Sequence, residues 1–329
     1  MDKRALRADI LLLLTAGIWG FGFVAQRSGM EYVGPFAYNG IRFILGSLSL
    51  LPLILIRKKP RESSVKKLLL FSLAAGFCLF VAVILQQFGI MFTTAGNAGF
   101  ITGLYVVLTP VFGIFLGKKT GPATWLGSGF TLAGLYFLCA AGHLDSINPG
   151  DVITVASAAF WACHVLIIDR LVKDADPIRL SAGQFAVCGL LALAGAFLAE
   201  PFIVPAIERV DPALLSAGTF AWLPFPALLS GLSAGGAAFP AEALIPILYG
   251  GLGSVGIAYT LQAVAQRDAP PAHATIILCL EGCFAAFGGA LLLSEKIGQW
   301  TLLGFFLMLA GMLVTQWEVV VKSGFKKAT

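Results

Sequence analysis

The chain alternates between long apolar segments and short polar ones. About ten of the apolar segments approach the ~20 residues that a helix needs to cross the hydrocarbon core of a bilayer. None of them shows the alternating strand pattern of roughly ten residues that an outer-membrane barrel requires. The predicted spans are residues 8–28, 36–56, 68–92, 95–116, 122–141, 150–171, 179–199, 242–266, 270–293 and 300–321.

Composition supports an all-α polytopic membrane protein. Of the 329 residues, 58% are hydrophobic and only 12% are charged, and the mean hydropathy is +0.89. A soluble domain has about a quarter of its residues charged, so this chain lacks the charge to cover a water-facing surface. The net charge of +5 does not indicate a nucleic-acid partner, because the basic residues cluster between the apolar segments. The expected surroundings are a lipid bilayer.

The distribution of basic residues predicts the orientation. Lys and Arg concentrate in cytoplasmic loops of membrane proteins. With both termini in the cytoplasm, the inner loops of a ten-span layout collect 18 of the 22 Lys and Arg residues. The pattern therefore predicts a multi-pass protein of a bacterial-type inner (plasma) membrane, with both ends cytoplasmic.

An internal repeat organises the chain. Residues 9–51 match residues 151–193 at a single offset, through seven identical pairs: Asp9/Asp151, Ala16/Ala158, Trp19/Trp161, Pro35/Pro177, Phe43/Phe185, Leu48/Leu190 and Leu51/Leu193. The fifth and tenth spans also match, as in Gly127/Gly304 and Gly134/Gly311. We predict two five-helix repeats, 8–141 and 150–321, of which the second enters the membrane from the opposite side. Substrate sites of such inverted repeats lie near the bilayer midplane, at the repeat interface.

The second repeat contains a Pro/Gly-rich insertion at about 201–241. Its apolar part, 214–232, is broken by Pro224 and Pro226, which would interrupt helical hydrogen bonds. We interpret the insertion as an excursion on the outer face, lying at the membrane interface or partly inserted in it.

Several stretches resemble the EamA-type family of the drug/metabolite transporter superfamily. They are Trp19-Gly20, 93–100 leading to Thr109-Pro110, Leu280-Glu281, Ser294-Glu295 and the paired glycines of the fifth and tenth spans. The likeness covers roughly residues 9–317. Departures are Gly282, where family members often have proline, and Gly117-Lys118, where Gly-Glu is common. The resemblance implies a secondary transporter, often an exporter of amino acids or other small metabolites, with alternating access around a central cavity.

Enzymatic and cofactor-binding alternatives find little support. The run 251–256 matches G-x-G-x-x-G, but a dinucleotide site needs a preceding strand and an acidic residue about 20 positions on. No H-E-x-x-H motif occurs, and Ser254 is not in a G-x-S-x-G arrangement, because position 252 is leucine. We expect no enzyme activity, no catalytic residue, no metal and no cofactor. Since no ATP-binding motif is present, transport would be passive or coupled to protons.

Ionisable groups within the spans are candidates for function, because they are costly in hydrocarbon and usually face a cavity. Arg42 could hold a substrate carboxylate, or it could pair with Glu281 or with helix-end carbonyls. Glu281 and His164 are candidates for proton coupling, although a structural acid and a packing histidine would fit the same pattern. Arg42 corresponds to Gln184 in the second repeat.

Aromatic rings beside a few polar groups are what a small-molecule site requires. The predicted substrate-binding residues are Trp19, Tyr38, Arg42, Asn97, Tyr105, Trp161, Gln184, Tyr259 and Gln262. We predict an exporter of a small metabolite such as an amino acid. The alternatives are a carrier of lipid-linked compounds or cationic drugs, or a non-transporting membrane scaffold or enzyme. A non-transporting protein would lack a polar central cavity.

Overall fold

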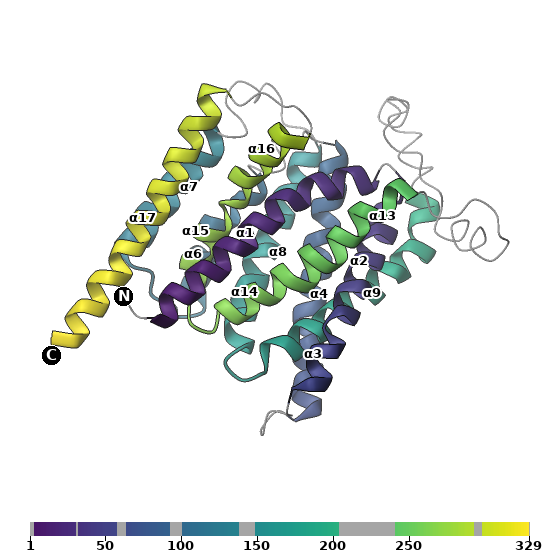
Figure 1. Ribbon diagram of the computed structural model, residues 1–329, viewed down its shortest axis with the longest axis horizontal. Helices are drawn as coiled ribbons and strands as arrows, with labels where there is room; N and C mark the ends of the chain where they lie inside the picture. Colours follow the sequence, from purple (N-terminus) through teal and green to yellow (C-terminus); the bar gives the residue numbers. More distant parts are fainter. Residues whose placement is uncertain are drawn as a thin grey trace.

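The computed structural model describes residues 3–30, 32–57, 64–92, 101–137, 149–203, 241–292 and 298–328, and these form helices joined by turns (Figure 1). The side chains of residues 27, 30, 241, 289, 292 and 316–328 are not described. The predicted insertion falls almost entirely outside the described residues, as do the motif residues 93–100, Ser294 and Glu295.

The first half of the chain forms six described helices. They are α1 (Lys3–Met30), α2 (Pro35–Ser49), α3 (Leu51–Ile56), α4 (Val65–Phe92), α6 (Tyr105–Phe115) and α7 (Pro122–Leu135). The second half forms α8 (Pro149–Leu171), α9 (Pro177–Leu198), α13 (Ala241–Leu248), the π-helical η2 (Tyr249–Tyr259), α14 (Thr260–Ala265), α15 (Pro271–Leu278), α16 (Glu281–Leu292) and α17 (Gln299–Ala328).

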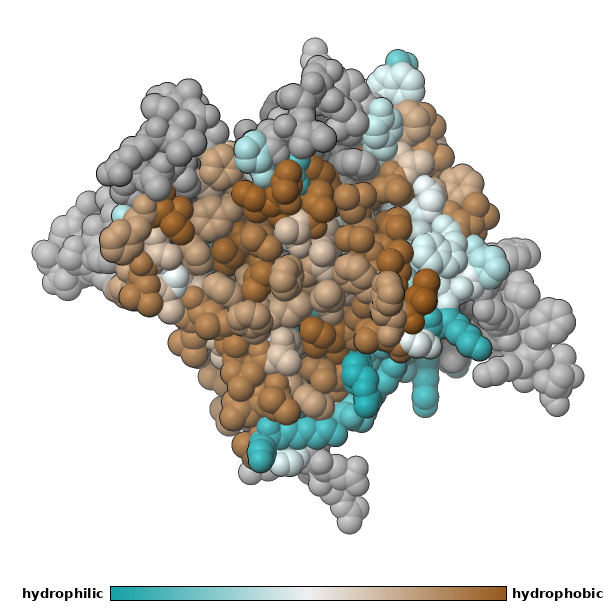
Figure 2. All heavy atoms as spheres, turned by 180° about the vertical axis from the view of Figure 1, so that it is seen from behind, coloured by the Kyte–Doolittle hydropathy of each residue, from teal (hydrophilic) through white to brown (hydrophobic). Residues whose placement is uncertain are grey.

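Seven stretches of the described residues are long and apolar enough to cross a membrane. They are Lys3–Gln26, Pro35–Ile56, Val65–Phe92, Pro149–Leu171, Pro177–Leu198, Glu242–Ala265 and Pro271–Gly288. Two shorter apolar helices, Ile101–Phe115 and Gln299–Thr315, accompany them. Each of the ten predicted spans overlaps a described helix, and ten complete crossings remain a prediction. The surface agrees with a membrane location, since Figure 2 shows a broad apolar belt with hydrophilic side chains gathered at one end.

Proline and glycine set the ends and the packing of the helices. Pro35, Pro122, Pro177 and Pro271 each lie at the start of a helix, where the missing N–H would have no intrahelical partner. Pro246 lies inside α13, just before the π-helical segment η2.

The glycines of the G-x-G-x-x-G run serve close packing. They lie in η2, a helical segment, so the strand that a dinucleotide site requires is absent there. A Cβ atom at Gly251 would lie 2.6 Å from Leu45, and one at Gly256 would lie 2.5 Å from Ser49. The glycines therefore let η2 approach α2 closely.

Helices from the two halves pack against each other throughout the bundle. The pairs α2/α9, α6/α15 and α7/α17 join the two halves, and α4 contacts both α8 and α9. α1 packs against η2 and α16, α2 packs against η2, and α6 packs against α8. These contacts enclose a buried core that includes Tyr38, Phe43, Phe185 and Tyr259, and the candidate site lies beside it.

Candidate functional site

A small pocket lies inside the bundle, where the two halves meet. Its volume is about 40 Å³, little more than one water molecule occupies, so the pocket as it stands has no room for a metabolite. It brings together seven residues predicted from the sequence: Trp19, Arg42, Tyr105, Trp161, Tyr259, Gln262 and Glu281. They come from seven different helices of both halves. The other lining residues are Phe23, Gln26, Gln86, Thr102, Val165, Ser254 and Leu278.

Aromatic rings packed around Tyr259 form one wall of this pocket. The Tyr259 ring centroid lies 4.5 Å from that of Trp19, and 6.0 Å from that of Trp161 in a nearly parallel arrangement. Trp19 Nε1 donates to the carbonyl oxygen of Ser254 over 3.2 Å, which fixes the first indole. Trp161 Nε1 is buried and has no hydrogen-bond partner among the described residues. The repeat-related tryptophans thus flank one tyrosine, and one indole keeps a free donor.

Arg42 places a buried positive charge on the pocket wall. Its side chain belongs to α2, and the residue is 2% exposed. Nε and Nη2 donate to Asn39 Oδ1 over 3.0 and 2.7 Å, and Cζ lies 5.0 Å from the centroid of the Phe43 ring. No carboxylate of the described residues forms an ion pair with it, so the suggested pairing with Glu281 is not formed. Nη1 has no hydrogen-bond partner in the same part of the chain.

Tyr105 and Glu281 are the first residues of α6 and α16, each just after a short tightened turn. The helical pattern is interrupted at Leu104, just before α6, and again between α15 and α16. The two interruptions lie side by side, since Cys279 Sγ donates to the carbonyl oxygen of Gly103 over 3.7 Å. The backbone stays right-handed helical at both points, where Leu104 N–H donates to Ile101 O and Leu280 N–H donates to Ile277 O and so tightens the turn.

Three predicted site residues lie behind the pocket rather than in its wall. Tyr38 is fully buried, and its hydroxyl donates to the carbonyl oxygen of Pro246 over 3.4 Å. His164 Nε2 and Gln184 Oε1 are 2.9 Å apart and form a buried hydrogen bond. His164 meets the Tyr259 ring edge-on, with 6.4 Å between the centroids, so this pair supports the aromatic wall. The remaining candidate, Asn97, lies outside the described residues.

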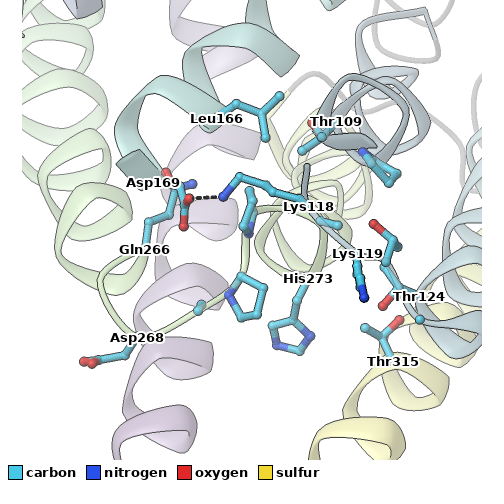
Figure 3. A pocket seen from close by; sticks show the side chains of 18 of the residues that line it. Thr109, Lys118, Lys119, Thr124, Leu166, Asp169, Gln266, Asp268, His273 and Thr315 are labelled. Carbon is cyan, nitrogen blue, oxygen red and sulfur yellow. Dashed lines mark hydrogen bonds and ion pairs between the residues drawn. The ribbon is translucent and has the colours of Figure 1, made fainter. Parts of the chain in front are cut away.

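A second, larger cavity of about 530 Å³ opens at the end of the bundle that carries the loop after α6 (Figure 3). We call it the basic-end cavity. Its ionisable lining residues are Lys118, Lys119, Asp169, Lys173, Arg267, Asp268 and His273. Asp169 is buried and pairs with both Lys118 and Lys173, and Figure 3 marks its pair with Lys118 by a dashed line.

None of the predicted substrate-binding residues lines the basic-end cavity. Sequence reasoning missed it because most of its charged groups come from short connections between helices, whose meeting in space depends on the packing. His273, by contrast, belongs to a helix, α15. Its Nε2 lies 2.8 Å from Asp9 Oδ1 and so ties α15 to α1.

Comparisons with known proteins agree with this architecture. A family model described as the EamA-like transporter family matches residues 6–140 and 236–317. The chain belongs to the EamA-like transporter family. The match covers both halves of the chain on either side of the predicted insertion.

Relatives of this EamA-like protein carry transporter names. An "Uncharacterized transporter" of Archaeoglobus fulgidus is 26% identical over 96% of this chain and 88% of that protein. The "Uncharacterized inner membrane transporter YedA" of Escherichia coli K12 is also 26% identical, over 79% of this chain and 92% of that protein. A protein of known crystal structure superposes with a TM-score of 0.69 and 17% identity, covering 94% of this chain and 96% of that one. The last likeness concerns the fold alone. Family and relatives point to a multi-pass membrane transporter rather than an enzyme.

Proposed function

We propose that this EamA-like protein is a secondary transporter that exports a small carboxylate-bearing metabolite, such as an amino acid. The observation that carries the proposal is Arg42, a buried guanidinium that faces the central pocket without a carboxylate partner among the described residues. An arginine cannot shed its charge, and an unpaired buried charge is costly. A substrate carboxylate that binds Nη1 would supply the missing anion.

The rest of the pocket fits a zwitterionic or amphipathic metabolite. Glu281 adds one acidic group, Gln262 adds a neutral polar group, and the aromatic wall offers an apolar surface. The buried cation at Arg42 disfavours the cationic-drug alternative, because desolvated like charges repel strongly.

Alternating access would use the two inverted repeats, 8–141 and 150–321. If the first five predicted spans correspond to the last five, the helix contacts occur in equivalent pairs. The α4/α8 contact corresponds to α1/η2, α4/α9 corresponds to α2/η2, and α6/α8 corresponds to α1/α16. Each of the contacts α2/α9, α6/α15 and α7/α17 joins a helix to its own counterpart in the other repeat, so exchange of the repeats leaves these contacts unchanged. Such pairing is expected from a two-fold axis through the pocket.

We further propose that the substrate enters from the basic-end cavity, which the positive-inside rule assigns to the cytoplasm. A single layer separates this cavity from the central pocket. Val165 lines the pocket and Leu166 lines the cavity, and the same relation holds for Gln262 and Gln266, one turn apart. Movement of this layer would connect the two spaces and admit a cytoplasmic substrate.

Binding of carboxylates and of their amides tests the role of Arg42. Purified protein in detergent would be screened by thermal stabilisation against metabolites, and each acid that binds would be compared with its amide. Arg42→Gln should lose the stabilisation by acids and keep that by amides, whereas Arg42→Lys, which keeps the charge without the planar fork, should retain part of the acid response. Equal loss of acids and amides in Arg42→Gln would identify a structural arginine and refute the proposal.

A further inference from the structure

The basic-end cavity has the charge of an anion site. Four cationic and two acidic side chains line it. Lys118 and Lys173 both pair with Asp169, which neutralises one of their two positive charges. Lys119 and Arg267 form no ion pair with any carboxylate in the described ranges. Lys119 and Arg267 are therefore available to bind an anionic ligand. The one exposed acidic residue of the cavity, Asp268, lies at its edge in Figure 3.

Two helices begin at the wall of this cavity. α7 starts at Pro122 after Gly121, and α15 starts at Pro271 after Pro270, and neither start is capped by a side-chain hydrogen bond. The N-terminus of a helix carries a partial positive charge and presents unbonded N–H groups, so it favours phosphate and other anions. Both starts therefore add to the positive potential of the cavity.

Three buried polar side chains in the wall have atoms without a partner. Thr109 Oγ1, Gln266 Oε1 and His273 Nδ1 form no hydrogen bond with the described residues, and the three residues are 0%, 1% and 5% exposed. Buried polar atoms are almost always hydrogen-bonded in folded proteins. Gln266 Nε2 already donates to the carbonyl oxygen of Val165, and His273 Nε2 is held by Asp9. The unpartnered atoms of Gln266 and His273 thus lie on side chains that a second hydrogen bond already anchors.

We propose that the basic-end cavity binds a phosphate group, held by Lys119 and Arg267 near the starts of α7 and α15. The Thr109 hydroxyl would donate to a phosphate oxygen, and Gln266 Oε1 would accept from a P–OH group, which a carboxylate lacks. This site is separate from the central pocket around Arg42. The phosphate could belong to a soluble ion or ester or to the phosphodiester of an anionic lipid. The two cations and the Thr109 hydroxyl would recognise both sources, whereas only a soluble phosphate or monoester offers a P–OH group to Gln266 Oε1.

Titration of inorganic phosphate into the full-length protein, purified in dodecyl maltoside, measures the site directly by calorimetry. The double variant Lys119→Gln/Arg267→Gln should bind phosphate about tenfold more weakly or worse, because it loses charge-assisted hydrogen bonds. Lys66→Gln is the matched control. Lys66 is an exposed lysine near the start of α4 and does not line the cavity, so this variant should bind phosphate as the parent does.

A second variant tests the buried wall independently of surface charge. Thr109→Val removes a hydroxyl that forms no hydrogen bond in the protein, so the variant should fold normally and bind phosphate several-fold more weakly. Arg42→Gln should leave phosphate binding unchanged, which separates this proposal from the role of the central pocket.

Phosphatidylglycerol distinguishes the two sources of phosphate. Native mass spectrometry would count the phosphatidylglycerol molecules retained by the parent and by the double variant. Retention that is lost in the double variant, together with competition against inorganic phosphate, identifies a lipid headgroup. Phosphate binding without competition identifies a soluble ligand. The proposal is overturned if neither probe binds the parent, or if the double variant binds both probes as the parent does.

Discussion

Replacement of Glu200 by glutamine should remove a defined part of the pH dependence of stability. Glu200 follows α9, at the opposite end of that helix from the basic-end cavity, and is 3% exposed. Its Oε1 accepts a hydrogen bond from the backbone N–H of Phe36 over 3.3 Å, in the first turn of α2. Gly34 permits this approach, since a Cβ atom there would lie 1.9 Å from Glu200 Oε1. Oε2 is buried without a partner in the described part of the chain.

Burial determines the ionisation of this carboxyl group. Desolvation raises the pKa of Glu200 from 4.5 to about 7, and the backbone N–H groups of Phe36 and Ala37 oppose the rise. The folded protein therefore holds this proton more tightly than the unfolded chain does. At roughly 1.4 kcal/mol per pKa unit, full ionisation costs the folded state about 3 kcal/mol. The cost sets in above about pH 4.5, the ordinary pKa, and is complete above about pH 7.

Unfolding in mixed micelles of dodecyl maltoside and SDS, followed by circular dichroism between pH 5 and 8.5, provides the assay. The free energy of unfolding of the parent should fall with rising pH up to about pH 7 and then level off. Glu200→Gln cannot ionise, so its curve should lack this fall and exceed that of the parent by up to about 3 kcal/mol at pH 8.

Glu242→Gln serves as the control, because it makes the same chemical change at an exposed carboxylate of α13. Its pH curve should run parallel to that of the parent. If the curve of Glu200→Gln also ran parallel, Glu200 would already be ionised at the lowest pH tested, and the burial argument would be wrong.

Two further predictions concern coupling and packing. If Glu281 carries the coupling proton, Glu281→Gln in proteoliposomes should abolish flux driven by a pH gradient and spare counterflow; unchanged pH dependence would exclude that role. At the α7/α17 contact, a Cβ atom on Gly127 would lie 2.2 Å from Thr315 Oγ1 and 2.7 Å from the carbonyl oxygen of Gly311. Gly127→Val should therefore destabilise the protein by about 1–3 kcal/mol. Gly129→Val is the control, because a Cβ atom at Gly129 meets nothing within 4 Å, and it should have the same free energy of unfolding as the parent. A similar decrease in the free energy of unfolding of both variants would refute the packing argument.

Much of the architecture could be predicted from local properties of the chain. The predicted spans 68–92 and 150–171 differ by only a few residues from α4 and α8, because hydrophobic length and helix-starting prolines are local signals. The repeat also anticipated that Trp19 and Trp161 would play related roles, and both line the central pocket beside Tyr259.

The sequence did not indicate which polar residues of the apolar helices line the central pocket. Gln26, Gln86 and Gln184 are all glutamines in apolar helices, yet the first two line the pocket and the third binds His164 behind it. Which face of a helix points inward depends on its rotation and on its neighbours, and the hydrophobic pattern of a membrane helix defines that rotation poorly, because lipid and protein interior are both apolar.

The sequence by itself determined that this protein is a helical membrane protein with one strongly basic set of loops, since length, composition and charge act along the chain, and it predicted two duplicated halves. Tertiary structure alone decided that Arg42 faces the pocket without a carboxylate partner in the described residues, that Glu200 caps α2, and that Lys119 and Arg267 share a cavity. These three features join residues far apart in the chain. Their energies depend on burial and on distances between side chains, which exist only after the helices have packed.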